Sequence, residues 1–120
     1  MRIDMSIENL FVWRESRILV NDVYKIMNSC RDYGFKDQIQ RAAVSIMNNI
    51  VEGCESGSDA KFANFLSIAR GSCGEVRSML YLCEDFGFCS IEEGERLQYQ
   101  VRKITSGIRK LSDSLIQNNS

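Results

Sequence analysis

Residues 62–83 read FANFLSIARGSCGEVRSMLYLC, and the spacing of their apolar side chains decides the fold class. Apolar residues recur there in steps of four and three: Phe62, Leu66, Ala69, Cys73, Val76, Leu80 and Cys83. This spacing places them on one face of a helix, and its mean of about 3.5 residues is typical of near-parallel helices that pack knobs-into-holes. Residues 62–83 therefore predict a long helix whose apolar seam packs against other helices.

Comparable series lie on both sides of this segment. Towards the C-terminus the apolar residues are Leu97, Val101, Ile104, Ile108, Leu111 and Leu115, and before the segment they are Ile39, Ala42, Ala43, Ile46 and Ile50. Near the N-terminus, a narrow arc of one helix contains Leu10, Trp13, Val20, Tyr24 and Met27. All three series have helical spacing, so nearly the whole chain is predicted to be helical.

Cap residues and a glycine indicate where these helices begin and end. Ser90 and Glu93 match a capping box, and Ser58 is a suitable N-cap residue for the helix that follows it. Gly87 can take the left-handed conformation that ends a helix. We therefore expect helices over about residues 8–30, 35–54, 58–86 and 91–116.

The fold class follows from the helices and the length of their connections. The chain has 120 residues, which suits a single domain over residues 1–120. Connections of about three to six residues force neighbouring helices to run antiparallel, so we predict an all-α, up-down-up-down four-helix bundle. Met79–Cys83 is the longest unbroken apolar run, far below the roughly 18–20 residues of a membrane span, so no membrane contact is expected.

Composition argues against most enzymes built on helical bundles. The chain contains no histidine, which removes the commonest general base and metal ligand, and with it the Glu-x-x-His motif of di-iron proteins. A P-loop and a Gly-x-Gly-x-x-Gly fingerprint are also absent. The net charge of −1 gives no general attraction to nucleic acid. We therefore expect a protein that is not an enzyme, with no catalytic residue, no cofactor and no metal.

Five cysteines are present, and none forms a Cys-x-x-Cys pair: they are Cys30, Cys54, Cys73, Cys83 and Cys89. Charged residues near the N-terminus interrupt any signal-peptide core, so the thiols are expected to stay reduced in the cytoplasm. Core packing is the favoured interpretation, because cysteine packs as a small hydrophobe. A zinc or redox site is the alternative.

Two helices carry more apolar surface than one buried seam requires. The additional residues are Val12, Leu19 and Ile26 on the first helix, and Phe65, Ile68 and Met79 on the third. They form either a wide core arc or an interface that neighbouring subunits cover. The second interpretation predicts a ring-shaped homo-oligomer, because a closed ring leaves no free apolar edge.

The second helix has a polar stripe that consists of Arg41, Ser45, Asn48 and Glu52, with Asn49 on its flank. Asparagine is a poor helix former, so a pair of asparagines in mid-helix has an energetic cost. Three interpretations stay open: a solvated face, a hydrogen-bonded contact between subunits, and a site for a ligand or partner.

Cations gather on the last helix. Between Glu95 and Asp113 the chain has five basic residues and no acid: Arg96, Arg102, Lys103, Arg109 and Lys110. Their spacing turns all five away from the apolar seam of that helix. The face they form is either simply solvated or a contact for the phosphates of RNA or for an acidic partner.

A cluster of small residues, Gly71-Ser72-Cys73-Gly74, lies within the longest apolar series. It resembles a glycine-rich phosphate loop in composition, but its position in mid-helix argues against that role. Small side chains in a helix instead predict a close approach to a neighbouring helix.

The segment QIQRAAVSIMNNIVEG, residues 38–53, resembles the pattern Q-x-x-R-A-A-x-S-I-P-x-N-I-x-E-G of the four helix bundle protein family. That family is also called the 23S rRNA-intervening-sequence or S23 ribosomal protein family. Residues 58–75 and Leu10–Trp13 are similar to two further blocks of it, so the resemblance runs from about residue 7 to 115. Met47 stands where the family usually has proline, and the second helix is expected to be straighter as a result.

The resemblance implies an antiparallel four-helix bundle that assembles as a ring, with a homopentamer as the expected form. More distantly, the chain is similar to the accessory proteins of diversity-generating retroelements, which bind a reverse transcriptase and nucleic acid. From the residues and the resemblance together, we expect a non-enzymatic, cytoplasmic, oligomeric interaction or scaffold protein. An RNA-binding accessory factor that uses the basic face of the last helix is the alternative.

Overall fold

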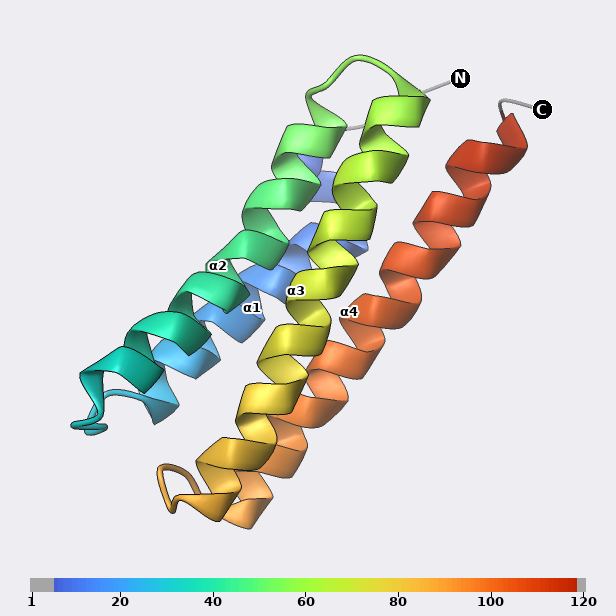
Figure 1. Cartoon of the computed structure of the whole chain (residues 1–120). Helices are drawn as coiled ribbons and strands as arrows, with labels where there is room; N and C mark the ends of the chain where they lie inside the picture. The colour runs from blue at the N-terminus through green and yellow to red at the C-terminus, as the bar shows by residue number, and fades with distance from the viewer. Residues whose placement is uncertain (1–5, 119–120) are drawn as a thin grey trace.

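A computed structural model describes residues 6–118 of the chain, and within that range it contains helices and turns but no strand. The helices are α1 (Phe11–Ile26), α2 (Tyr33–Cys54), α3 (Asp59–Asp85) and α4 (Ile91–Asn118), and a short 3-10 turn at Ile7–Asn9 precedes α1. The prediction of an all-α, four-helix fold is confirmed (Figure 1).

The four helices lie side by side in one elongated bundle of about 47 × 20 × 20 Å. α1 packs against α2 and α4, and α3 packs against the same two helices from the other side. The α1–α2 and α3–α4 turns lie at one end of the bundle, and the α2–α3 turn lies at the other (Figure 1). Depressions lie on both sides of α3, one towards α2 near the turn that joins them and two towards α4.

The predicted caps form. Ser90 and Glu93 exchange two hydrogen bonds of 3.0 Å at the start of α4, and this contact lowers the pKa of Glu93 because the Ser90 amide stabilises the carboxylate. The Ser58 hydroxyl accepts from the Lys61 amide at 3.2 Å, and Gly87 ends the α3 segment with φ of +74°. Helix ends therefore follow local hydrogen-bonding chemistry, as expected.

Two helix boundaries differ from the prediction at the α1–α2 turn. α1 ends at Ile26 rather than near residue 30, and α2 begins at Tyr33 rather than 35. The carboxylate of Asp32 explains the early start of α2, because it accepts a hydrogen bond of 3.1 Å from the Phe35 amide and so acts as the N-cap. α2 is continuous through Met47.

The predicted seams form the core. Every member of the Phe62–Cys83 series on α3 and of the Ile39–Ile50 series on α2 is buried. On α4 the whole series is buried except Leu111, which is partly buried. Helical periodicity therefore identified three of the four core faces correctly.

The structure corrects the predicted core face of α1. The buried residues of α1 are Val12, Ser16, Leu19, Val23 and Ile26, whereas Tyr24 of the predicted arc is 47% exposed. Leu10, Trp13 and Val20 are only partly buried, and Met27, just after the end of α1, is the one member of the predicted arc that is fully buried. The buried series of α1 is hard to recognise in the sequence, because the polar residue Ser16 interrupts its apolar pattern. Its hydroxyl donates to the carbonyl of Val12, one turn earlier, so it can be buried without an unpaired polar group.

Small residues bring α2 and α3 close together. A Cβ atom added to Gly53 would lie 2.7 Å from Cδ1 of the buried Phe62, so only glycine fits at this contact. The prediction for Gly71-Ser72-Cys73-Gly74 is half right. Ser72 and Cys73 are buried, but an added Cβ at Gly71 or Gly74 would meet nothing within 4 Å. Those two glycines therefore make no close helix contact within residues 6–118.

Four of the five cysteines are buried, as the core interpretation expected, and Cys89 is partly buried. Burial raises the pKa of the Cys73 thiol to about 11 and that of the Cys83 thiol to about 12. Both thiols therefore stay protonated at neutral pH, which makes them poor nucleophiles. Across the described part of the chain, no three histidine, cysteine or acidic side chains are grouped to hold a metal ion. No helix in that part combines the length and apolar character that crossing a membrane requires.

Candidate functional site

The predicted subunit interface belongs largely to the core of the single chain. Val12, Leu19, Ile26 and Met79 are each at most 9% exposed. This is a correction to the interface prediction, because side chains that pack inside one chain offer no surface to another. Phe65 is only partly buried and Ile68 is 53% exposed, so these two remain candidates for contact with a neighbour.

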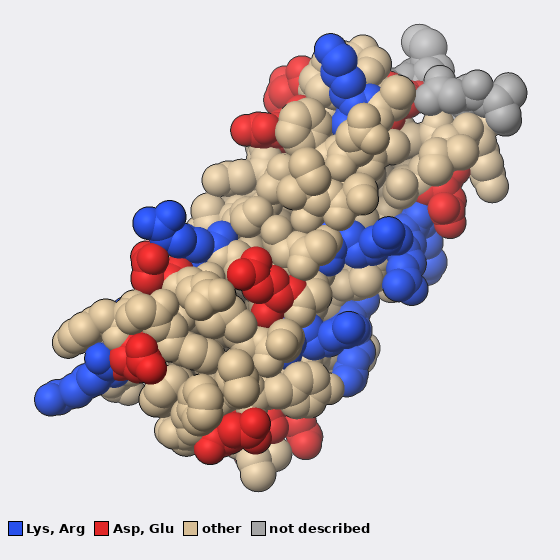
Figure 2. Space-filling view, viewed as in Figure 1, with Lys and Arg blue, Asp and Glu red and all other residues tan. Residues whose placement is uncertain are grey.

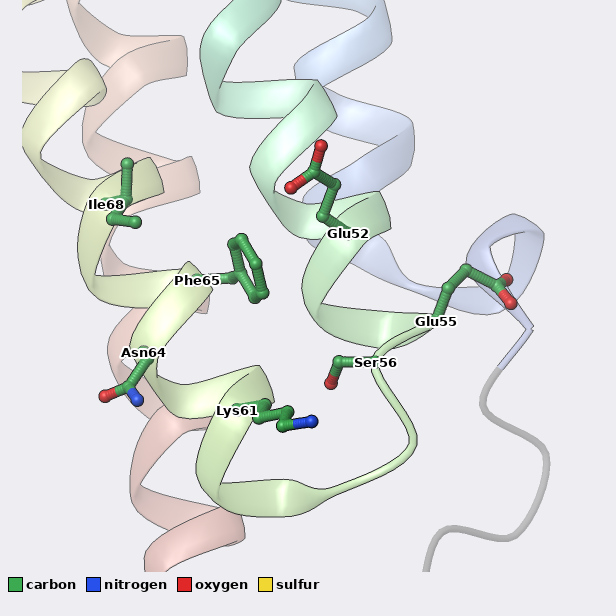
Figure 3. Close-up of a pocket in the computed structure, with 7 residues that line it drawn as sticks. All are labelled: Glu52, Glu55, Ser56, Lys61, Asn64, Phe65 and Ile68. Atoms are coloured by element: carbon green, nitrogen blue, oxygen red, sulfur yellow. The ribbon is translucent and has the colours of Figure 1, made fainter.

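Phe65 and Ile68 line an open groove of about 690 Å³ between α2 and α3, near the turn that joins them. In Figure 3 the Phe65 ring projects from α3 towards α2, and Ile68 lies one turn further along α3. The charged rim of this groove consists of Glu52 of α2, Glu55 just after α2, and Lys61 of α3. An apolar floor with a charged rim is the ordinary composition of a protein contact surface.

The structure divides the predicted polar stripe of α2 into an inner and an outer part. The inner part faces α3: the Ser45 and Ser72 hydroxyls lie 2.9 Å apart, and the amide of Asn49 donates to the Ser45 carbonyl at 2.8 Å. These bonds satisfy polar groups at the close α2–α3 contact. They give Ser45 and Asn49 a structural role within one chain.

The outer part of the stripe is exposed. Arg41 pairs with Asp37 in the preceding turn of α2 at 2.8 Å, and Asn48 is exposed two turns further along the helix. Arg41 and Asn48 line a groove of about 590 Å³ together with Ser45 and Asn49 of α2 and Tyr24 of α1. Glu52 lies instead at the rim of the α2–α3 groove. Four of the five stripe residues therefore border one groove, and only Glu52 lies outside it.

The basic face of α4 is also divided, into two edges. On the edge towards α1, Arg96 pairs with Asp22 at 3.3 Å and Lys103 pairs with Glu15 at 3.2 Å. These two cations hold α4 to α1. Lys110 continues this edge and is exposed.

On the other edge of α4, Arg102 and Arg109 border the groove between α3 and α4. Arg70 of α3 lines the same part of that groove as Arg109. Arg70 and Arg77 were missed in the sequence, although their separation of seven residues was the available signal. Figure 2 shows Lys and Arg side chains along the middle of α4 and its border with α3.

Residues 8–110 match the sequence profile of the 23S rRNA-intervening sequence protein family. That range covers most of the chain, including all of α1, α2 and α3 and the first two thirds of α4. The chain belongs to this family. The match agrees with the resemblance found in residues 38–53.

A solved structure supports the same assignment. It is described as a protein with unknown function from the S23 ribosomal protein family of Bacteroides thetaiotaomicron VPI-5482, and it is 25% identical in sequence to this chain. The match has a TM-score of 0.78 and covers 84% of this chain and 97% of that one. Among proteins with curated descriptions, none matches this chain. Neither the family description nor that of the solved structure names an enzymatic activity.

Proposed function

We propose that this member of the 23S rRNA-intervening sequence protein family is a non-enzymatic interaction or scaffold module in the cytoplasm. In this proposal its helices keep the up-down-up-down order, and copies of the chain assemble into a ring, a homopentamer by analogy with the family. The observation that carries the proposal is the α2–α3 groove, where Phe65 and Ile68 remain in contact with water. A second subunit that covered this apolar floor would gain burial energy of roughly 25 cal/mol per Å².

Light scattering after size exclusion, at micromolar concentration, tests assembly directly. A peak near five times 13.7 kDa supports the ring, and a single peak at 13.7 kDa contradicts it. Ile68→Glu should lower the mass of the assembly, because it places a charge on the floor of the groove. The matched control is Ile18→Glu on the outer face of α1, since Ile18 is 46% exposed and Ile68 is 53% exposed. That variant should keep the wild-type mass.

A specific observation favours a second candidate, an RNA-binding accessory factor. Arg102, Arg109 and Lys110 form no ion pair within residues 6–117, so their charges are available to an anionic partner. Binding to phosphates releases counterions and must weaken steeply with salt. A salt titration of RNA binding by the whole chain therefore tests this candidate, and an affinity that does not fall with salt would contradict it.

A further inference from the structure

The groove between α3 and α4 is lined by Arg70 of α3 and by Arg102 and Arg109 of α4. Arg70 and Arg109 line a part of about 350 Å³, and Arg102 lines a neighbouring part of about 390 Å³. Arg77 is seven residues after Arg70 and so lies on the same face of α3. Its carbonyl accepts a hydrogen bond of 2.9 Å from Gln98, which lies one turn before Arg102 on α4. Arg70 and Arg109 therefore form one rung across the groove. The spacing of seven residues on both helices, together with the Gln98 contact, puts Arg77 level with Arg102 as a second rung.

The two rungs are about 10 Å apart, because seven residues of helix rise by about 1.5 Å each. Gly74 lies between them, one turn from Arg70 and one turn from Arg77. A Cβ atom there would meet nothing within 4 Å, so packing within residues 6–118 does not require glycine. Glycine in a helix interior is about 0.8–1.0 kcal/mol less favourable than alanine. Glycine is the usual residue where a ligand approaches the backbone closely, which supports an occupant of this groove.

The arginines of this groove are not held in ion pairs, although Asp113 lines its first part and Glu84 and Glu95 line its second. All four arginines are exposed, and none forms an ion pair with a carboxylate of residues 6–117. Arginine presents a planar fork of donors that matches two phosphate oxygens at once. Arg96 and Lys103, on the opposite edge of α4, already have carboxylate partners on α1.

We propose that the groove formed by Arg70, Arg77, Arg102 and Arg109, here called the arginine groove, binds the phosphodiester backbone of single-stranded RNA. This inference rests on the RNA-binding candidate and deepens it, because it moves the contact from α4 alone to the border of α3 and α4. Axes of packed helices lie about 8–10 Å apart, so the depression between them suits one strand better than a duplex. Asn64, Ser67 and Ser112 line the groove beside the first rung, and their amide and hydroxyl groups can bond the 2′-hydroxyl of RNA.

Fluorescence anisotropy with a labelled oligouridine of about twenty nucleotides tests the inference on the full chain. For four phosphate contacts by single-stranded RNA, log K should fall against log salt with a slope of about −3. The double variant Arg70→Gln/Arg109→Gln should lose at least about tenfold in affinity at low salt, and its slope should fall to about −1.5. The matched control Arg96→Gln/Lys103→Gln removes the same charge from the other edge of α4 and should stay within about twofold of wild type.

Each other outcome has a definite meaning once circular dichroism shows that both variants are folded. If the chain binds RNA and the two double variants lose the same affinity, the arginine groove is wrong while the RNA-binding candidate stands. If the wild-type chain binds no oligouridine at low salt, both are wrong. Equally tight binding of oligodeoxythymidine overturns the choice of RNA. Binding of polyglutamate without binding of RNA shows that the groove takes an acidic polypeptide, and this also overturns the proposal.

Discussion

α4 meets its two neighbours in different ways along its two edges. Towards α1, its cations pair with carboxylates, as Lys103 does with Glu15, and Gly107 fits against the α1 side chains. A Cβ atom added to Gly107 would lie 2.8 Å from Cγ1 of Val12. Towards α3, Arg102 and Arg109 form no ion pair among residues 6–117, and a Cβ atom added to the nearby Gly74 of α3 would meet nothing within 4 Å.

The difference shows that two pairs of cations with the same spacing in the sequence can have different roles in the structure. Arg96 and Lys103 are seven residues apart, and so are Arg102 and Arg109. Only the first pair forms ion pairs, because α1 places Asp22 and Glu15 along that edge. Acids also line the α3–α4 groove beside Arg102 and Arg109, but no ion pair joins them to these arginines among residues 6–117. We interpret the α1 edge as a structural junction and the α3 edge as a surface kept free for a partner.

The largest loss of stability is expected at Leu19 of α1, in the core behind the α1–α4 junction. This side chain is fully buried, so Leu19→Glu would bury a charge without a partner. Uncompensated buried charges typically cost about 3–5 kcal/mol, so the variant should be largely unfolded. Urea denaturation followed by circular dichroism measures the loss. The neighbouring variant Ile18→Glu is the control and should change stability by less than about 0.5 kcal/mol, because Ile18 is exposed. A folded Leu19→Glu protein that merely dissociates would restore Leu19 to a subunit interface.

The next largest effect is expected at Gly107 itself. Gly107→Val would push its side chain against Val12, which is 3% exposed and has no space to withdraw. Overpacking of this kind costs about 1–3 kcal/mol, measured by the shift of the urea midpoint. An unchanged midpoint would mean that the junction is looser than its contacts indicate. That result would contradict the interpretation of the α1 edge of α4 as a tightly packed structural junction.

Gly74 should respond in the opposite direction. Gly74→Ala should stabilise the protein by up to about 1 kcal/mol, because alanine has the higher helix propensity and meets no neighbour. Gly74→Val is the matched partner of Gly107→Val and should be tolerated. A clear loss of stability in Gly74→Ala would show that a contact covers this position. A gain would mean that the native residue is not the most stable one, which is typical of functional surfaces.

Most of the fold could be predicted because its signals are local. The seams of α2, α3 and α4 consist of apolar residues in unbroken order, and the capping box of Ser90 and Glu93 needs only four residues to be recognised. The prediction of the core face of α1 was wrong for an equally specific reason. Ser16 occupies a core position and satisfies its hydroxyl within its own helix, so the pattern of apolar residues alone favoured the wrong face.

The candidate site was less predictable because its meaning depends on contacts between helices. The charge run of α4 was visible, but the carboxylate that neutralises Arg96 lies 74 residues earlier in the chain. Likewise, nothing in the spacing of Arg70 showed that it would border the same groove as Arg109. Charge patterns along one helix therefore identify candidates, and only the packing of helices separates structural cations from available ones.

The smallest effect is expected from the ion pair of Lys103 and Glu15, and it tests the junction most directly. The Lys103 side chain is 40% exposed and that of Glu15 is 19% exposed, so solvent weakens their attraction. A double-mutant cycle with Lys103→Met and Glu15→Gln should give a coupling energy of about 0.2–1 kcal/mol, as exposed pairs do. This coupling should shrink in high salt, since ions screen the pair.

The same cycle with Arg102→Gln in place of Lys103→Met is the control, because Arg102 lies on the other edge of α4 and should not couple to Glu15. Equal coupling for both cations would mean that Glu15 responds to the overall charge of α4 rather than to one partner. The two edges would then be electrostatically equivalent, and neither the junction nor the arginine groove could be assigned from ion pairing. Coupling confined to Lys103 leaves the charges of Arg102 and Arg109 without an internal role, which an anionic partner in the groove would supply.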